Sequence, residues 1–357
     1  MKKIDLNNLG LTERLSEEAK QYQGLYIGRV SSQAKDLYRV LMEEGELRAE
    51  VSGKFRHLAS TPSDYPVVGD FVLVDRTDNS NGNGIIHQVL TRKSCFGRKA
   101  AGSNDLQVVA ANIDQVFICM ALNNDFNPRR LERYLSIAWD SGAIPVVVLT
   151  KADLCPDIEA KVDALSPLTV GVDLLITTSM SSDGYAAVQS RIVNGRTVAF
   201  IGSSGVGKST LINRLLGEER LATYEIRNDD KGRHTTSRRE LILIPGGGVV
   251  IDTPGMRELG IIGADLSKSF ADIDELAVSC RFRDCTHGSE PGCAVQQAIK
   301  EGFLSVERLA SFKKLQKEAK YNGLNSKQIE KEKINAMFKG MGGMKNARRF
   351  IKEKTRK

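Results

Sequence analysis

The sequence of 357 residues lacks a long hydrophobic run: its longest uninterrupted apolar segment, Val116 to Leu122, has seven residues. A helix that spans a bilayer needs about 20, so we expect neither a membrane-spanning protein nor a membrane partner. The first twenty residues mix Lys, Asp, Glu and Arg and contain no apolar stretch of the kind found in secretory signals. We therefore expect a cytoplasmic protein.

Cysteine is scarce, with 6 residues in the chain. Because the cytosol keeps thiols reduced, these cysteines are expected to be free thiols or metal ligands rather than a disulfide framework. Hydrophobic residues make up 41% and charged residues 27% of the sequence, which excludes a fibrous or wholly disordered protein. The length favours two or three domains over one hydrophobic core.

Charge is distributed unevenly along the chain. The net charge is +7, but residues 311–357 contain 15 Lys or Arg against 4 Asp or Glu, a net of +11, which leaves −4 (7 − 11) for the rest. A basic tail on a mildly acidic body suits a polyanionic partner such as RNA. A solvated tail that only aids solubility is an equal alternative from charge alone.

Residues 24–89 contain five short segments rich in strand-forming residues. They are Leu25–Val30, Leu37–Met42, Glu46–Val51, Phe71–Val74 and Ile85–Val89. Five short strands separated by turn signals are typical of an OB-fold barrel, a fold that often binds oligonucleotides. Basic residues in or near these segments favour RNA binding, although exposed Lys and Arg are also ordinary surface residues: Lys54, Arg56, Arg92, Lys93, Arg98 and Lys99.

Beyond Leu106 the pattern changes to strands that alternate with helices, which predicts a mostly parallel sheet covered on both faces. The expected strands are Val116–Met120, Ile144–Leu149, Leu174–Ile176, Val198–Ile201 and Val249–Ile251. After Leu259 the chain is expected to be helical. Apolar residues there recur at spacings of three and four and so define one helix face: Leu309, Phe312, Leu315 and Ala319.

The strongest motif is a complete phosphate-binding loop, G-x-x-x-x-G-K-[ST], that lies between an expected strand and an expected helix. It consists of Gly202, Ser203, Ser204, Gly205, Val206, Gly207, Lys208 and Ser209, and Thr210 follows it. Backbone N–H groups at the start of the helix can wrap a phosphate chain. Lys208 is expected to reach the β- and γ-phosphates and Ser209 to bind Mg²⁺.

A second motif predicts which base the nucleotide carries. Thr150, Lys151 and Asp153 directly follow an expected strand and resemble the N-K-x-D element with which GTPases read guanine. The carboxylate would accept hydrogen bonds that adenine cannot offer, so a wrong base would leave it unpaired. Ser179, after the next expected strand, fits the loop that contacts guanine O6. Thr150 replaces the usual Asn, so the supporting contact of that residue stays open.

A third motif, Asp252-Thr253-Pro254-Gly255, matches the D-x-x-G element. Asp252 would hold Mg²⁺ through water, and the Gly255 N–H would sense the γ-phosphate. Between this motif and the phosphate loop lie His234, Thr235 and Thr236, where a switch loop should supply a Thr to the Mg²⁺ shell.

The order of these motifs predicts a circular permutation. In Ras-type GTPases the base-reading element follows the phosphate loop, whereas Asp153 precedes Lys208 here. Such a rearrangement leaves the site intact, because every motif lies in a loop at the carboxyl edge of one sheet.

The C-terminal part begins with three cysteines and a histidine, spaced C-x₄-C-x-H-x₅-C. Three thiolates and one imidazole make a closed tetrahedral site, which predicts a structural zinc ion. The expected ligands are Cys280, Cys285, His287 and Cys293. Unrelated cysteines or disulfides are the alternative.

Together, the barrel, T-K-A-D ahead of G-S-S-G-V-G-K-S, G-R-H-T-T, D-T-P-G and the cysteine–histidine cluster resemble the RsgA (YjeQ) family of ribosome small subunit dependent GTPases. The resemblance implies a bacterial cytoplasmic enzyme that hydrolyses GTP to GDP and phosphate and acts late in maturation of the small (30S) ribosomal subunit. It also implies stimulation by that subunit, contact with ribosomal RNA, one zinc ion and GTP-bound Mg²⁺. We expect a monomer.

Met256 stands where Ras-type enzymes have the Gln that orients the attacking water, so intrinsic hydrolysis should be slow. His234 is the candidate to replace it, in keeping with the resemblance, which implicates the matching histidine. The alternative is that His234 only packs or caps the loop. The catalytic set expected is His234, Lys208 and Gly255.

Four segments follow from these motifs: an N-terminal extension and OB-fold barrel over 1–105, a circularly permuted GTPase domain over 106–265, a helical zinc-binding domain over 266–325 and a basic tail over 326–357. Two other functions stay open. One is an RNA-binding module in which GTP is only a structural ligand; the other is a P-loop ATPase or kinase, which Asp153 disfavours.

Overall fold

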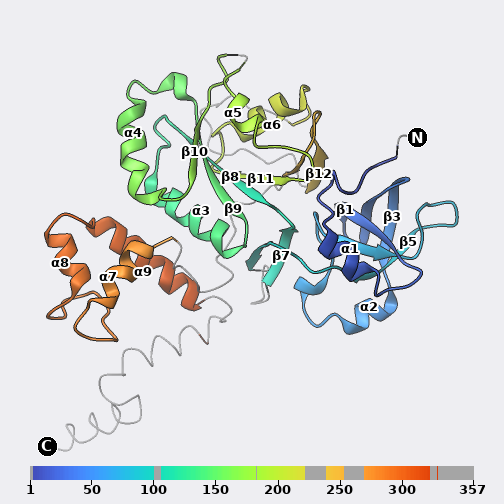
Figure 1. Ribbon diagram of the computed structural model, residues 1–357, viewed down its shortest axis with the longest axis horizontal. Helices are drawn as coiled ribbons and strands as arrows, with labels where there is room; N and C mark the ends of the chain where they lie inside the picture. Colours follow the sequence, from blue (N-terminus) through green and yellow to red (C-terminus); the bar gives the residue numbers. More distant parts are fainter. Residues whose placement is uncertain are drawn as a thin grey trace, which may run out of the picture.

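The computed structural model describes residues 3–99, 106–181, 183–221, 239–252, 269–321 and residue 328. Figure 1 shows a small barrel next to a central sheet with helices on both faces, and a group of C-terminal helices on the far side of that sheet from the barrel. Within the described residues, no helix is long and apolar enough to cross a membrane.

The barrel forms from the five segments predicted for it. Its strands are β1 (Tyr26–Ala34), β2 (Leu37–Met42), β3 (Gly45–Val51), β4 (Phe71–Val74) and β5 (Gly84–Val89). They pair in the order β1-β2-β3-β5-β4, and β4 pairs again with β1, which closes the barrel. Alternate residues of β2 point inward, since Tyr38, Val40 and Met42 are all buried. The expected OB-type barrel is confirmed.

Short helical elements surround this barrel. They are α1 (Glu13–Ala19), α2 (Gly53–Leu58) and the 3₁₀ turn η1 (Pro62–Asp64). The Thr12 side chain caps α1, and Leu15 of that helix packs against Phe71 and Leu73 of β4. The segment ahead of the first strand therefore covers one side of the barrel.

The central sheet is mostly parallel, as predicted. Its strands are β8 (Gln115–Ala121), β9 (Ile144–Thr150), β10 (Asp173–Ile176), β11 (Thr197–Gly202), β12 (Glu240–Leu243) and β13 (Val249–Asp252). They lie in the order β10-β9-β8-β11-β13-β12, and only β12 runs antiparallel to its neighbour β13. Sequence patterns did not predict β12, because a strand of four residues carries little periodicity.

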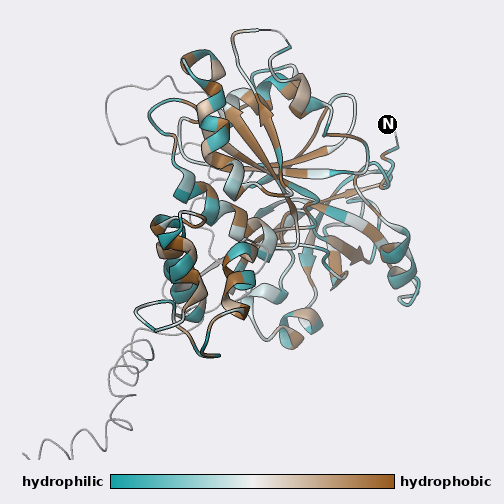
Figure 2. Ribbon diagram, turned by 60° about the vertical axis from the view of Figure 1, so that its left-hand side comes forward, coloured by the Kyte–Doolittle hydropathy of each residue, from teal (hydrophilic) through white to brown (hydrophobic). Residues whose placement is uncertain are grey.

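Helices cover both faces of the central sheet. They are α3 (Pro128–Asp140), α4 (Ile158–Leu165), α5 (Ala186–Gln189) and α6 (Lys208–Leu216), with 3₁₀ turns η2 (Ala152–Leu154) and η3 (Ser166–Leu168). The strands separate these helices, and in Figure 2 they form a brown hydrophobic layer. Alternate residues of β8 serve the two faces, since Val116 packs with the core beneath α3 and α4 and Phe117 with the core beneath α5 and α6.

The barrel and the central sheet are joined through β1. Ser32 of β1 pairs with Glu240 of β12, so the two sheets are continuous. Arg29, fully buried, donates to the Leu9 carbonyl and to the Thr197 hydroxyl of β11, the latter at 2.8 Å. Burial lowers the pKa of Arg29 to about 10, which still leaves it charged at neutral pH. A single buried cation thus connects the N-terminal segment, the barrel and the central sheet.

A separate hairpin connects the barrel to the first strand of the central sheet. It consists of β6 (Cys95–Lys99) and β7 (Leu106–Ala111), which pair antiparallel. The segment limit expected at residue 105 falls between these two strands.

The C-terminal part is helical, as expected, with α7 (Ala271–Val278), α8 (Ala294–Lys300) and α9 (Val306–Tyr321). The four residues predicted to form one apolar face of α9 are all buried in a core shared with α3. Arg308 of α9 donates to Glu132 of α3 at 2.9 Å and to Asp272 of α7 at 2.6 Å. This buried ion-pair network fastens the C-terminal helices to the central sheet. Apart from residue 328, the expected tail over 326–357 lies outside the described residues.

Candidate nucleotide site and metal centre

The phosphate loop follows a fully buried strand. Strand β11 ends at Gly202, whose φ of 145° lies outside the range that other residues readily adopt. A Cβ at this position would lie 2.3 Å from the Cys119 carbonyl oxygen of β8, so only glycine fits. Gly205 and Gly207 also have positive φ, and α6 begins directly after Gly207.

The lysine and hydroxyl groups of the motif stand at the start of α6. Lys208 donates from Nζ to the carbonyls of Gly202 at 2.9 Å and Ser203 at 2.5 Å, so its ammonium group lies within the loop. Ser209 and Thr210 follow in the first turn and are half-buried. Ser204 is exposed and Val206 is buried.

The base-reading motif contacts the phosphate loop directly. The hydroxyl of Thr150, at the end of β9, donates to the Val206 carbonyl at 2.6 Å. Thr150 is 5% exposed. The supporting contact made by Thr150, which replaces the usual Asn, is therefore a hydrogen bond that links the two loops.

The other residues of the base-reading motif surround the ends of β9 and β10. Lys151 has a left-handed φ of 57°, which turns the chain back over the sheet. The Asp153 carboxylate accepts a hydrogen bond from the Thr178 hydroxyl at 2.5 Å. Ser179 is exposed, and its carbonyl accepts a hydrogen bond from Arg214 of α6 at 2.8 Å. Asp153 and Ser179 thus lie in loops held against each other and against α6.

Asp252 ends β13, the neighbour of β11. Burial raises the pKa of Asp252, and the charge of Lys208 acts in the opposite direction. Because β9, β10, β11 and β13 are parallel, the predicted motifs that follow them meet at one edge of the sheet. The remaining predicted residues lie outside the described residues: His234, Thr235, Thr236 and Gly255.

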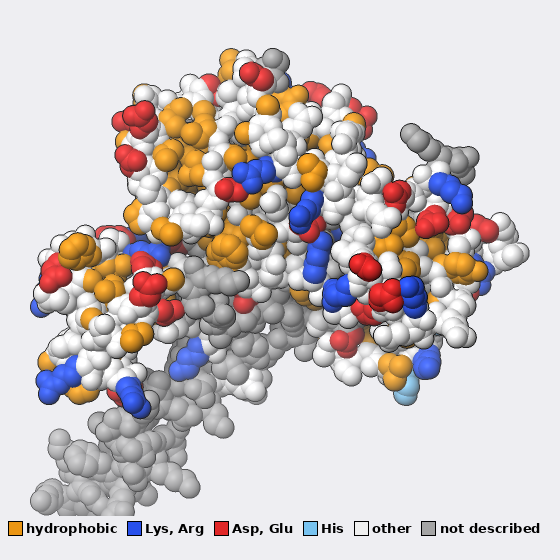
Figure 3. Space-filling model, in the orientation of Figure 1, with side chains coloured by type: hydrophobic (Ala, Val, Ile, Leu, Met, Phe, Trp, Pro, Cys, Tyr) orange, Lys and Arg blue, Asp and Glu red, His pale blue; other side chains and the backbone are white. Residues whose placement is uncertain are grey.

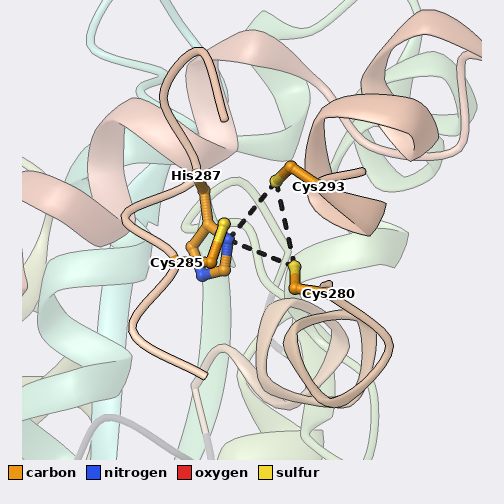
Figure 4. A group of neighbouring side chains, drawn as sticks. All are labelled: Cys280, Cys285, His287 and Cys293. Atoms are coloured by element: carbon orange, nitrogen blue, oxygen red, sulfur yellow. Dashed lines mark hydrogen bonds between the residues drawn. The ribbon is translucent and has the colours of Figure 1, made fainter. Parts of the chain in front are cut away.

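The cysteine–histidine cluster lies between α7 and α8 (Figure 4). One ligand atom from each of Cys280, Cys285, His287 and Cys293 lies within 4.8 Å of the others. The His287 Nδ1 atom is 3.7 Å from the Cys280 Sγ and 3.6 Å from the Cys293 Sγ, and the two Sγ atoms are 3.9 Å apart. A tetrahedral zinc ion with Zn–S near 2.3 Å and Zn–N near 2.0 Å requires ligand atoms about 3.5–3.8 Å apart. The four residues therefore fit a tetrahedral metal ion.

Neighbouring side chains hold the loop that carries His287. Its carbonyl accepts from Gln296 of α8 at 2.7 Å and from Lys313 of α9 at 2.8 Å. Burial, followed by the charge of Lys313, lowers the pKa of His287. This favours the neutral imidazole, the form that binds a metal.

Two of the basic residues predicted to favour RNA binding form ion pairs within the fold. Arg92 donates to both carboxylate oxygens of the buried Asp70 at 2.8 and 2.7 Å and to the Ser63 and Tyr65 carbonyls. Lys93 pairs with Asp114 at 2.7 Å. The carboxylates are distant in sequence, so these ion pairs could not be predicted, and RNA binding by the two side chains stays a prediction. Lys54 and Arg56 are exposed on α2, and the side chains of Arg98 and Lys99 lie outside the description.

Sequence reasoning also missed two residues of the site. Thr178, which contacts Asp153, directly precedes Ser179. Only the serine was assigned to the base-reading site from the sequence. Arg130, in the first turn of α3, donates to the Ser203 hydroxyl of the phosphate loop and to Asp125 at 2.8 Å. The sequence feature that could have indicated Arg130 is the pair of arginines that follows Asn127-Pro128 at the start of the expected helix.

A phosphate loop after a buried parallel strand, bonded to a base-reading motif that precedes it in the chain, defines a circularly permuted P-loop GTPase. The sequence model of the RsgA GTPase family matches residues 89–262. The chain belongs to the RsgA GTPase family.

Relatives and solved structures agree with this assignment. The chain is 49% identical over 346 residues to the Small ribosomal subunit biogenesis GTPase RsgA 2 of Lactiplantibacillus plantarum, covering 97% of this chain and 98% of that protein. It is 44% identical to the RsgA 1 protein of Listeria innocua, covering 89% and 90% of the two chains.

Two solved structures share the fold. The crystal structure of YjeQ from Thermotoga maritima superposes with a TM-score of 0.62 at 27% identity, over 83% of this chain and 98% of that one. YloQ, described as a circularly permuted GTPase, superposes with a TM-score of 0.60 at 26% identity, over 84% and 96%.

Proposed function

We propose that this protein binds GTP with Mg²⁺, hydrolyses it to GDP and phosphate, and acts as a late maturation factor of the small ribosomal subunit that stimulates it. The hydrogen bond from Thr150 to Val206 carries this proposal. It holds the base-reading loop and the phosphate loop together at one edge of the sheet. The names of the relatives, which describe small ribosomal subunit biogenesis, support the cellular role.

The nucleotide contacts follow from the positions of the loops. Backbone N–H groups of residues 203–210 at the start of α6 surround the phosphates, and Lys208 binds the β- and γ-phosphates. Asp153 accepts hydrogen bonds from the guanine base, with Thr178 supporting the carboxylate, while the Lys151 stem covers one purine face. Ser179 lies where the guanine O6 would be contacted. ATP would leave the Asp153 carboxylate without donors, so we expect strong preference for GTP.

The donors of Ser209 and Asp252 suit Mg²⁺, because both offer the oxygen ligands that this ion prefers. Bound there with a switch-loop Thr235 or Thr236, the ion would neutralise charge on the β- and γ-phosphates. His234 orients the attacking water, since Met256 has no group for this purpose. Hydrolysis then breaks the bond between the γ-phosphorus and the bridging oxygen, and GDP leaves as product.

The cysteine–histidine cluster holds a structural zinc ion, because three thiolates and an imidazole leave no ligand position for water. The ion organises the loop between α7 and α8, whose own apolar side chains are few. Packing of α9 against α3 then places this zinc-binding part beside the GTPase core.

Ribosomal RNA is the proposed partner of the barrel, the zinc-binding part and the basic tail over 326–357, which holds 11 Lys or Arg against 3 Asp or Glu. On the face drawn in Figure 3, basic and acidic side chains are interspersed over the barrel rather than gathered by sign. Recognition by this face would therefore rest on shape and polar contacts more than on net charge. A monomer in the cytoplasm fits this role. The four segments expected from the sequence are retained as a proposal, with the connecting hairpin between the first two.

Cosedimentation with purified small ribosomal subunits tests the proposal. With a non-hydrolysable GTP analogue the protein should pellet with the subunits, and with GDP or an ATP analogue a much smaller fraction should do so. Equal cosedimentation with all three nucleotides, or none with any, would contradict it.

A further inference from the structure

Helices α3 and α9 lie side by side at the junction of the GTPase core and the zinc-binding helices (Figure 1). A basic groove lies between them. Its volume is about 420 Å³. Four of its eight lining residues are cationic and none is acidic. The lining consists of Asn127, Arg129, Arg130, Arg133, Ala310, Ser311, Lys314 and Leu315.

The walls of the groove are two helices joined by an ion pair. Asn127 caps α3 by accepting a hydrogen bond from the Arg130 backbone N–H at 3.0 Å, and Pro128 occupies the first helical position. One turn into α3, the Glu132 carboxylate accepts from Arg308 of α9. The groove is therefore built from two helices fastened to each other, and a ligand would not have to order it.

Two of the cations are available for a ligand. Arg129 and Lys314 are exposed, and neither has a hydrogen bond or ion pair with another residue in the described part of the chain. Arg130 is paired with Asp125, so the positive potential that attracts anions comes chiefly from Arg129 and Lys314 on the two facing helices. Guanidinium groups in particular match phosphate oxygens with paired N–H donors.

The arrangement favours a ligand with several phosphates in a row. Arg129 lies on α3 and Lys314 on α9, so a chain of phosphates that follows the groove can meet both cations. A second cavity of about 310 Å³ continues past Arg130 and Arg133 to Ser203 of the phosphate loop. The cationic lining thus extends from α9 along α3 to the nucleotide site.

We propose that the groove between α3 and α9 binds the phosphate backbone of RNA. This inference rests on the proposed ribosomal role for the identity of the polyanion, and it names the surface that the RNA occupies. Arg130 lines the groove and also donates to the Ser203 hydroxyl. RNA in the groove therefore competes for, or orients, a side chain that touches the phosphate loop.

Charge reversal tests the groove. A fluorescein-labelled single-stranded RNA of 15 nucleotides is titrated with full-length wild type, Arg129→Glu, Lys314→Glu and the control Lys161→Glu, a half-buried lysine of α4 outside the groove and outside the parts proposed to contact RNA. We expect each groove variant to weaken RNA binding about fivefold or more at physiological salt and to reduce the slope of log K against log salt by about 1. The control should change affinity less than about twofold. Zinc content and the thermal midpoint verify that each variant is folded.

Equal behaviour of the groove variants and the control would overturn the inference. The result can be separated from failure of the proposed function, because wild-type cosedimentation with small subunits is measured in the same preparations. If wild type binds the subunits and the groove variants bind both the subunits and the RNA probe as wild type does, the groove is wrong and the ribosomal role stands. If wild type ignores the subunits but the groove variants lose the RNA probe, the groove stands and the ribosomal role is wrong.

The contact between Arg130 and Ser203 adds a second readout. Binding energies are reciprocal, so RNA in the groove must change nucleotide affinity by the factor by which nucleotide changes RNA affinity. We expect wild type to bind the probe with different affinities in GDP and in a GTP analogue, and Arg130→Gln to reduce that difference. Identical affinities in both nucleotides for wild type would contradict the link through Arg130.

Discussion

Replacing Thr150 with valine isolates the link between the base-reading loop and the phosphate loop. Valine keeps the shape of the side chain and removes only the hydroxyl that donates to the Val206 carbonyl at 2.6 Å. Because Thr150 is buried, water cannot easily replace the lost donor. An unpaired buried carbonyl costs about 1–3 kcal/mol.

Measurements can distinguish whether this free-energy cost lowers GTP affinity or the stability of the folded state. If the lost hydrogen bond destabilises only the loop arrangement that binds nucleotide, GTP affinity drops by about 5- to 150-fold, which corresponds to about 1–3 kcal/mol. If its loss destabilises the folded state as a whole, the thermal midpoint drops by about 2–4 °C per kcal/mol instead. Titration with a fluorescent GTP analogue and thermal unfolding of the same samples distinguish the two.

Conservative variants serve as controls. Thr150→Ser retains a hydroxyl and should bind GTP within about threefold of wild type. The preference for GTP over ATP should persist in Thr150→Val, since Asp153 is unchanged. A valine variant with wild-type GTP affinity and wild-type thermal midpoint would refute the reasoning.

Further variants test the remaining assignments. Asp153→Asn should weaken GTP binding and favour xanthosine triphosphate, because an amide can donate to the xanthine 2-oxo group; unchanged base preference in competition binding would remove Asp153 as base reader. His234→Ala should lower the subunit-stimulated kcat by about 10²-fold or more with little change in GTP affinity, whereas Lys208→Ala should impair GTP binding itself; a wild-type stimulated rate would return His234 to a structural role. Chelation of the metal should raise hydrogen exchange in residues 280–293 while α9 stays protected through Arg308; unchanged exchange there would contradict a structural zinc site. Deletion of residues 326–357 should weaken subunit binding and flatten its salt dependence; equal affinity at low and physiological salt would show a solvated appendage.

Local patterns predicted most of the fold. The barrel strands, the parallel strands and the apolar face of α9 each follow from residues that are close in sequence, and all of them are present. The phosphate loop could also be predicted from local sequence. Its glycines, lysine and serine lie within one stretch of eight residues, with a strand before it and a helix after it.

Contacts between distant residues could not be predicted. The hydrogen bond from Thr150 to Val206 joins positions 56 residues apart, and the pair of Glu132 with Arg308 joins positions 176 apart. Arg92 was counted among the basic residues that favour RNA binding, and its ion pair with the buried Asp70, 22 residues away, could not be predicted from local sequence. Local sequence determines which groups are present, and tertiary packing determines which of them remain available to a ligand.

Activation of GTP hydrolysis by the small ribosomal subunit is the step on which the proposed function depends most. Phosphate release is measured at saturating GTP with and without purified small ribosomal subunits, so that the comparison reports kcat rather than nucleotide affinity. We expect a slow intrinsic rate that rises by orders of magnitude with the subunit. An unchanged kcat, with the subunit altering only the affinity for GTP, would contradict this expectation and identify an RNA-binding protein in which GTP is a structural ligand.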